Sequence, residues 1–388
     1  MEISGYCEEK FGEVKKAFEK NLNSGKECGA SFSVTIEGKT VIDFWGGYAD
    51  AAKTKPWQKD TIVNVYSTTK VATAICVLML ADKKIIDINA PVANYWPEFA
   101  QSGKEKITVG HLLSHTAGLP GFDEALELKD LYNWEKITET LSRQKPWWDD
   151  RRRSGYHVYT FGFLLGEVVK RVSKKSLGQY LKEEITGPMN IDFHIGISDL
   201  ERPRVAELIP PKAGIKGKIM MKMMGVMMRN TLFQKAFTNP TVDDTWHEDV
   251  MSKEWQSAEI PAANGHGNAR SVAKIGTILA NGGELDGVRF LSHEIIEKTL
   301  ESRTEGKDLV INMPIKFGLG LAINSDGGLI DKFCPNPRTL YWGGYGGSLI
   351  VADLDEKMSL AYVMNKQGYK MVGDSRAKRL IKAVYSSL

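Results

Sequence analysis

The sequence predicts an α/β fold in which the two ends of the chain come together and a mainly helical segment is inserted between them. Three observations predict it: β-like runs near residues 30–45, further β-like runs within 317–364, and helical patterns over most of the chain between them. A chain of 388 residues is long enough for one large domain of this kind. We expect the α/β part to comprise about 1–84 and 284–388, and the helical insert about 85–283 of a single domain, 1–388.

The N-terminal part predicts a helix, a hairpin and a second helix. Residues 8–22 place apolar side chains at helical spacing, with charged residues between them: Phe11, Val14, Phe18 and Leu22. The runs 30–36 and 40–45 are β-like, and the turn residues 37–39 predict that they form a hairpin. Residues 67–83 predict a helix that is apolar around most of its surface, which is typical of the core of a large domain.

Between 85 and 283 the patterns indicate helices separated by long loops. We expect helices at 108–114, 160–172, 177–185 and 271–281, the first of them ending at an Ala-Gly-Leu-Pro stop signal. The run 219–228 contains six methionines, and methionine fills irregular apolar spaces. We interpret this run either as a flexible stretch packed on the core or as an apolar lid over a substrate site.

The last third returns to strand character. Residues 317–323, 348–352 and 358–364 predict strands, with Asp355-Glu356 as the turn between the last two. An amphipathic pattern predicts a final helix from about 373 to 385.

Charge and hydropathy exclude several classes of function. The chain has 51 basic and 48 acidic residues, a net charge of +3, which does not favour nucleic acid or a membrane surface as a partner. The one local basic run, 151–153, is interpreted as a solvated turn. No apolar run reaches the roughly 18 residues that a membrane span needs, and the N-terminus lacks the pattern of a signal peptide.

The cysteines and the motifs predict neither a metal nor a cofactor. The four cysteines lie far apart and form no CxxC pair: Cys7, Cys28, Cys76 and Cys334. Free thiols fit a reducing compartment, so we expect a cytoplasmic protein. No H-E-x-x-H motif, phosphate loop or G-x-S-x-G motif in its usual context occurs.

Ser67 and Lys70 are the first candidate catalytic residues. Residues three apart on a helix share a face, so their side chains meet. A serine needs a base beside it to act as a nucleophile near neutral pH. A lysine serves as that base where burial lowers its pKa toward 7, and this lysine begins a very apolar helix.

The context of these residues resembles a known family. The segment around the Ser67-Thr68-Thr69-Lys70 tetrad is similar to the nucleophile helix of the serine β-lactamase and penicillin-binding-protein superfamily. The segments ITVGHLLSHTAGLPG and SGYHVYTFGFLLGEVVKRV resemble segments of its class C-like branch and of family VIII carboxylesterases. HGNARSVAKIGTILANGG and YWGGYGGSLIVADLDEKMSLAYVMN resemble their later helix and final strands, so the likeness runs in order from about 25 to 385.

The resemblance implies a fold and further site residues. The fold is β-lactamase/transpeptidase-like, an antiparallel sheet flanked by helices plus a mainly helical subdomain. Tyr156 falls on the family's motif tyrosine, which shares protons with the lysine and acts as base for the serine and acid for the leaving group. We expect the Lys70 ammonium to lower the pKa of Tyr156 from its usual value of about 10.

The segment Trp342-Gly343-Gly344-Tyr345 matches the strand that borders the family's active site. Two glycines on an edge strand let a ligand approach the backbone closely. By resemblance, the Tyr345 N–H joins that of Ser67 in an oxyanion hole, which stabilises the charge that develops in acyl transfer.

Two departures from the family favour an ester over a β-lactam substrate. The usual Tyr-x-Asn motif is Tyr156-His157-Val158, so the amide that holds a lactam side chain is missing. Trp342 and Gly343 replace the lysine and threonine of a Lys-Thr-Gly triplet, so the cation that holds the lactam carboxylate is also missing. The esterase branch carries the same changes, and we expect a carboxylesterase-like enzyme rather than a β-lactamase.

Two histidines lie near these motifs. His115 is interpreted as a structural residue that bonds the backbone near the turn at 118–120, not as part of a Ser-His-Asp triad. His157 is a minor candidate for lining the site.

The sequence thus predicts a serine hydrolase that forms an acyl-enzyme with a small-molecule acyl substrate, with ester hydrolysis as the first expectation. Acyl transfer and amide or D-amino-acid peptide cleavage remain alternatives, because they share the acylation step. A binding or structural module on the same fold is the alternative from another class, since a fold does not fix a function. The sequence leaves the acyl group, the acceptor and the oligomeric state open.

Overall fold

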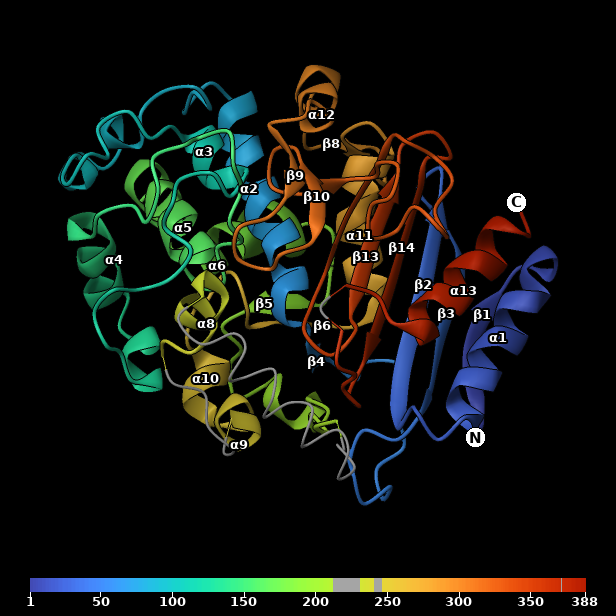
Figure 1. The fold of residues 1–388 in the computed structure, drawn as a ribbon. Coiled ribbons are helices and arrows are strands. Elements are labelled where there is room, and N and C mark those ends of the chain that lie inside the picture. Colours follow the sequence, from blue (N-terminus) through green and yellow to red (C-terminus); the bar gives the residue numbers. More distant parts are fainter. Residues whose placement is uncertain (212–230, 241–245, 371) are drawn as a thin grey trace.

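The computed structural model describes residues 1–211, 231–240, 246–370 and 372–388. Within them, one sheet of nine antiparallel strands forms the centre of the α/β part (Figure 1). In spatial order its strands are β1 (Ile3–Cys7), β3 (Lys39–Gly47), β2 (Gly29–Ile36), β14 (Met358–Met364), β13 (Leu349–Asp353), β12 (Thr339–Gly343), β11 (Ala322–Ile323), β10 (Pro314–Phe317) and β9 (Thr304–Lys307).

The two ends of the chain meet in the middle of this sheet, as predicted. Strand β2, from the N-terminal hairpin, pairs along its length with β14, from Ala30 opposite Met364 to Ile36 opposite Met358. Both strands are buried on nearly every residue, because each face of the sheet is covered by helices.

Helices cover both faces of the sheet. The terminal helices α1 (Gly12–Asn23) and α13 (Ser375–Tyr385) pack against each other on one face, and α11 (Ala269–Ala280) packs on β2, β13 and β14 on the other (Figure 1). Gly276 allows this close packing, because a Cβ there would lie 2.3 Å from the Ser359 Oγ.

The remaining helices surround α2 (Thr69–Asp82), which is buried on all but its last residue. Helices α5 (Thr160–Ser173) and α6 (Leu177–Leu181) pack directly on it, and α3 (Val109–Leu113) and α4 (Trp134–Arg143) pack on α5. The others are α8 (Leu232–Phe237), α9 (Trp246–Met251), α10 (Lys253–Ser257) and α12 (His293–Thr299). A small sheet of β4 (Val63–Asn64), β6 (Gly265–Gly267) and β5 (Phe193–Ile195) lies beside α2, and β7 (Glu284–Leu285) pairs with β8 (Val288–Arg289).

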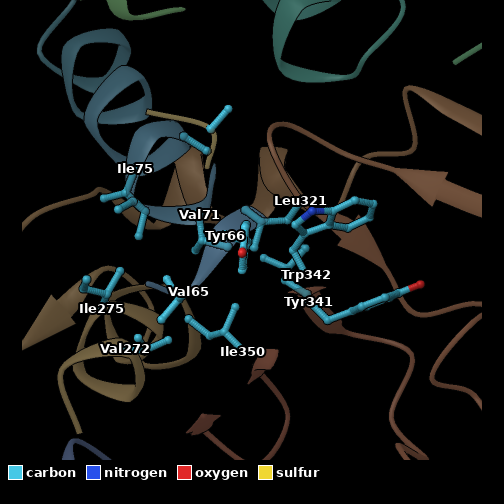
Figure 2. Packing of buried hydrophobic residues seen from close by; sticks show 14 of the residues in the cluster. Val65, Tyr66, Val71, Ile75, Val272, Ile275, Leu321, Tyr341, Trp342 and Ile350 are labelled. Atoms are coloured by element: carbon cyan, nitrogen blue, oxygen red, sulfur yellow. The ribbon is translucent and has the colours of Figure 1, made fainter. Parts of the chain in front are cut away.

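One apolar cluster joins the start of α2 to the sheet. Figure 2 shows Val71 and Ile75 of α2 near Val272 of α11, Ile350 of β13 and Trp342 of β12. All five side chains are buried. Close packing of buried apolar side chains holds a helix in one position on its sheet. The packing of α2 therefore determines where the residues at its start, including Lys70, are placed.

Two strand predictions needed correction. The run 317–323, expected as one strand, is divided between β10 and β11, which pair with each other across a turn in which Gly320 has a φ of +87°. Strand β1 was not expected, because three of its five residues are exposed and its sequence lacks an apolar alternation.

The division into an α/β part and a helical insert at 85–283 stays a prediction, and α11 lies within that range although it packs on the sheet. The methionine-rich run 219–228 lies outside the described residues. Among the helices that are described, none combines the length and the apolar character that crossing a membrane requires.

Candidate active site

Ser67 lies in a single 3-10 turn (Tyr66–Thr68) that leads into α2. Tyr66, just before it, has a left-handed φ of +47°. The turn is held at both ends, because the Val65 N–H donates to the Gly265 carbonyl at 2.9 Å and the Thr69 hydroxyl donates to the Tyr66 carbonyl at 2.5 Å. A left-handed residue other than glycine persists only where its surroundings hold it, and here it presents Ser67 to a cavity.

Lys70 points from the first turn of α2 toward Ser67, as the spacing predicted. Its Nζ lies 3.2 Å from the Ser67 Oγ, 2.8 Å from the Val158 carbonyl and 2.9 Å from the Ala262 carbonyl. The side chain is buried, and the part of the chain that the structure describes gives it no carboxylate partner. Burial without a counter-charge lowers the pKa of Lys70 well below its usual value.

These three contacts determine how an uncharged Lys70 is oriented. A neutral amine has two N–H groups and one lone pair. The carbonyls of Val158 and Ala262 accept both N–H groups, so the remaining tetrahedral position, the lone pair, is directed at the Ser67 Oγ. The arrangement therefore provides an acceptor for the serine proton.

Tyr156 approaches the same oxygen from another segment. Its hydroxyl donates to the Ser67 Oγ at 2.7 Å, and the Trp342 Nε1–H approaches the tyrosine oxygen at 3.4 Å. Asp308 fixes the backbone, because its carboxylate accepts the Tyr156 N–H at 3.1 Å. The sequence analysis did not identify Asp308, because the residues around it form no recognisable motif. Only its contact with the Tyr156 N–H identifies it.

The expectation that Lys70 lowers the pKa of Tyr156 is wrong. Burial raises that pKa above its usual value, and the hydrogen bonds that the Tyr156 hydroxyl makes with Ser67 and Trp342 only partly oppose the rise. The Lys70 Nζ lies 4.8 Å from the centre of the tyrosine ring and bonds two backbone carbonyls instead of the phenol oxygen. A neutral phenol is a proton donor, so the two groups differ in the chemistry that they offer to Ser67.

Gly344 brings the end of β12 onto the turn before Ser67. A Cβ at this position would lie 2.1 Å from the Val65 carbonyl oxygen and 2.4 Å from the Ser348 Oγ. The Ser348 hydroxyl in turn donates to the same Val65 carbonyl at 2.8 Å. Strand β12 lies between β11 and β13, but β11 pairs only with Leu340 and Tyr341, so the 342–343 end of β12 is an edge on the β11 side. The space at Gly344 is taken by the protein's own atoms and not by a ligand.

The two expected oxyanion donors are available. Neither the Ser67 nor the Tyr345 N–H donates to any group within the described parts of the chain. Both residues line one cavity, with Trp342 and Gly343 beside them. Free backbone N–H groups of this kind are the donors that stabilise a developing oxyanion.

The two histidines are structural. His115 Nδ1 accepts the His157 N–H at 3.0 Å, which agrees with the structural interpretation of His115. His157 is wholly buried, accepts the Leu119 N–H at 3.2 Å and faces the Gly155 carbonyl at 2.7 Å, so it is His157 that bonds the 118–120 turn. His157 does not line the cavity, which corrects the expectation for it, and burial lowers its pKa to about 3.

The comparisons with known proteins agree with this geometry. The family model described as β-lactamase matches residues 14–385. The chain belongs to the β-lactamase family. It is 32% identical over 369 residues to the esterase/β-lactamase LipL of Mycobacterium tuberculosis (strain ATCC 25618 / H37Rv), with 94% of this chain and 83% of LipL covered.

Two solved structures are similar to this protein over the full chain. A family VIII carboxylesterase is 38% identical with a TM-score of 0.90, and both chains are covered completely. A penicillin-binding-protein homologue from Caulobacter crescentus is 36% identical with a TM-score of 0.88, again with both chains covered completely.

The cavity beside Ser67 has no charged side chain in its described lining, and Trp342 stands where the family's motif has a lysine. The cavity has a volume of about 210 Å³. Around Ser67 and Tyr156, its aromatic lining consists of Tyr66, Tyr159, Phe237, Trp246, Trp342 and Tyr345, and its aliphatic lining of Val158, Ala263, Ile311, Met313 and Val372. No Lys, Arg, Asp or Glu is among the described lining residues. Most of these residues are separate in sequence and carry no shared motif, so sequence reasoning identified only those near the family's motifs.

Proposed function

We propose that this protein is a serine esterase that hydrolyses neutral esters through an acyl-enzyme on Ser67. One observation carries the proposal: Lys70 and Tyr156 converge on a single serine oxygen at an uncharged apolar cavity. A binding module without catalysis has no use for a buried, unpaired lysine directed at a serine. Burying such a group costs free energy unless function requires it.

Acylation uses the two proton-transfer groups in different roles. The Ser67 oxygen attacks the ester carbonyl carbon while its proton passes to the neutral Nζ of Lys70. The Ser67 and Tyr345 N–H groups stabilise the oxyanion. When the tetrahedral intermediate collapses, the C–O bond to the alcohol breaks and the Tyr156 hydroxyl protonates the leaving oxygen. The proton on Lys70 then returns to the Tyr156 phenolate, and both groups regain their starting state.

Deacylation uses the same two roles with water as the nucleophile. Neutral Lys70 takes a proton from the attacking water, and the Tyr156 hydroxyl protonates the Ser67 oxygen as the acyl bond breaks. The proton on Lys70 then returns to the Tyr156 phenolate, so the products are the free acid and the enzyme with Ser67, Lys70 and Tyr156 in their starting states.

The cavity favours an ester over a β-lactam. A lactam antibiotic carries a carboxylate, and a buried carboxylate needs a cation or several donors. The described cavity lining supplies no lysine or arginine, and Trp342 occupies the position of the family's lysine. The similar family VIII carboxylesterase supports the same preference, whereas the name of LipL gives both activities.

The test compares p-nitrophenyl butyrate with a chromogenic cephalosporin, for the native protein and for Ser67→Ala. The proposal predicts that the native kcat/KM is at least 100-fold higher for the ester, and that Ser67→Ala loses both activities. A cephalosporin rate equal to the ester rate would contradict the substrate assignment, and an active Ser67→Ala variant would contradict the mechanism.

We also propose that the enzyme works in the cytoplasm on small molecules. The support is that all four cysteines are free thiols, which a reducing compartment preserves.

A further inference from the structure

A basic cavity lies apart from the Ser67 cavity and shares no lining residue with it. Its volume is about 240 Å³. Its polar lining includes Thr108, His111, Ser114, Thr116, Arg151 and Arg303. No acidic side chain lines it among the described residues, so the charge around it is wholly positive.

Arg303 has an unsatisfied guanidinium. Its Nε is buried and has no hydrogen-bond partner among the described residues. Its nearest carboxylate, that of Glu301, lies 3.6 Å from Nη2, is mostly exposed and does not line the cavity. A buried donor without an acceptor is destabilising and rare in folded proteins. We therefore expect a bound ligand to supply the acceptor for the Arg303 Nε–H.

Arg151 supplies a second charge that is held in place. Its Nη1 donates to the Ala117 carbonyl at 2.8 Å and to the Trp148 carbonyl at 2.9 Å. Within the described parts of the chain its carboxylate partner is Asp149, which lies 3.4 Å away and is largely exposed. Residues 151–153 form the expected turn with 152 and 153 exposed, but Arg151 itself is only partly exposed, is oriented by neutral carbonyls and has its charge only weakly compensated by Asp149.

His111 supplies a directed N–H donor. Its Nδ1 accepts the Thr108 N–H at 3.1 Å, so in the neutral ring the proton is on Nε2. Burial and the nearby Arg151 and Arg303 lower the pKa of His111, which keeps the ring in this neutral form. Among the described residues no acceptor is paired with the His111 Nε2–H, and His111 lines the cavity.

We propose that this cavity binds a phosphate group carried by a small molecule. Two guanidinium groups and an imidazole N–H provide several donors around one space, and a phosphate group has the charge and the number of oxygens to accept from all of them. The Ser114 hydroxyl donates to the Gly110 carbonyl at 2.8 Å and pairs with the Thr116 hydroxyl at 3.0 Å, so the donors left for the phosphate are the two guanidinium groups and the imidazole.

The site is connected to the segment that carries Tyr156. The Thr304 hydroxyl donates to the Arg152 carbonyl and the Leu309 N–H to the Ser154 carbonyl, both at 2.8 Å. The two arginines thus lie on neighbouring segments that run on to Tyr156. A bound phosphate group would hold these segments together, so we expect binding to raise the melting temperature.

The test is isothermal titration calorimetry of the full chain with sodium phosphate, at constant ionic strength, with sodium acetate and sodium chloride as comparisons. We expect saturable phosphate binding that acetate does not match. Arg303→Gln should weaken it about tenfold or more, because it removes a charged donor. The matched control Arg338→Gln removes an equal charge outside the cavity, at a residue paired with Glu297, and should change Kd less than twofold.

A second measurement uses only native protein, so it does not depend on the folding of a variant. Phenylglyoxal modifies arginine side chains, and peptide mass spectrometry reports which ones. We expect phosphate to protect Arg303 but not Arg338. Equal modification of Arg303 with and without phosphate would overturn the proposal, as would phosphate binding no tighter than acetate or equal Kd values in the two variants.

Discussion

The Tyr156 hydroxyl donates a 2.7 Å hydrogen bond to the Ser67 Oγ across 89 residues of sequence. Lys70 reaches the same oxygen at 3.2 Å from the other side, and its remaining contacts are to backbone carbonyls and not to the phenol. Burial moves the two pKa values in opposite directions, toward a neutral amine and a neutral phenol. The serine therefore lies between a base and an acid that act separately.

Replacing Tyr156 with phenylalanine tests its role as the acid. The ring stays, but the leaving group loses its proton donor, which is worth about 10²–10⁴ in rate. We expect the larger loss with alkyl esters, whose alkoxides leave poorly, and a much smaller one with p-nitrophenyl esters. Steady-state kcat/KM values for matched butyrate esters measure this, and an equal loss for both leaving groups would argue against the assignment.

The pH dependence of kcat/KM tests Lys70 as the base. Only the neutral amine accepts the serine proton, so the rate should fall as the pH falls through the lowered pKa of Lys70. Because that group is the lysine, Tyr156→Phe should keep the same acidic limb at a lower overall rate. If the limb disappears in Tyr156→Phe, the phenol and not the amine is the titrating base.

The same lowered pKa predicts how stability depends on pH. Between the folded pKa of Lys70 and its unfolded value near 10.5, the unfolded chain binds one proton more than the folded one. The free energy of unfolding therefore rises with pH in this window, by up to about 1.4 kcal/mol per pH unit from this group. Urea unfolding at several pH values should show this slope for native protein and a flatter one for Lys70→Met. Parallel curves would mean that Lys70 is charged in the folded state.

Gly344→Ala tests the contact that places the Tyr345 N–H. The new Cβ would overlap the Val65 carbonyl at 2.1 Å, so β12 and the turn before Ser67 must move apart. We expect a loss of about 10²-fold in kcat, as for a lost oxyanion donor, and a destabilisation of about 1–3 kcal/mol. Gly12→Ala is the control, because Gly12 starts α1 with no atom near its Cβ position, and it should leave kcat unchanged. If Gly344→Ala kept the native kcat, the close contact between Gly344 and Val65 would not be needed to position the Tyr345 N–H.

The sequence predicted those parts of the site that depend on local patterns. Ser67 and Lys70 are three residues apart at the start of an apolar helix, and this spacing alone predicts that their side chains lie close together. The hairpin and the final strands were predicted from apolar alternation and turn residues. The break at Gly320 and the exposed strand β1 depend on pairing with distant segments, which no local pattern reports. Residues that act through tertiary contacts, such as Asp308, were missed for the same reason.

The direction of the Tyr156 pKa shift depends on burial and on the orientation of Lys70, and not only on the presence of a lysine nearby. A lysine near a tyrosine lowers the tyrosine pKa only if the lysine is charged and close to the oxygen. Here the Val158 and Ala262 carbonyls hold the amine over the ring and not at the phenol oxygen, and burial determines the direction of the pKa shift of Tyr156. Burial and orientation are properties of the folded chain, so the sequence alone gave the wrong sign.

The most direct test of the account is where the acyl group is attached. Native protein mixed with p-nitrophenyl butyrate, quenched in acid within milliseconds and digested, is analysed by peptide mass spectrometry beside Ser67→Ala. The account predicts a butyryl mass on the peptide that contains Ser67, absent from the variant, which should also show no turnover. A butyryl group on another residue, or turnover by Ser67→Ala at the native rate, would contradict it.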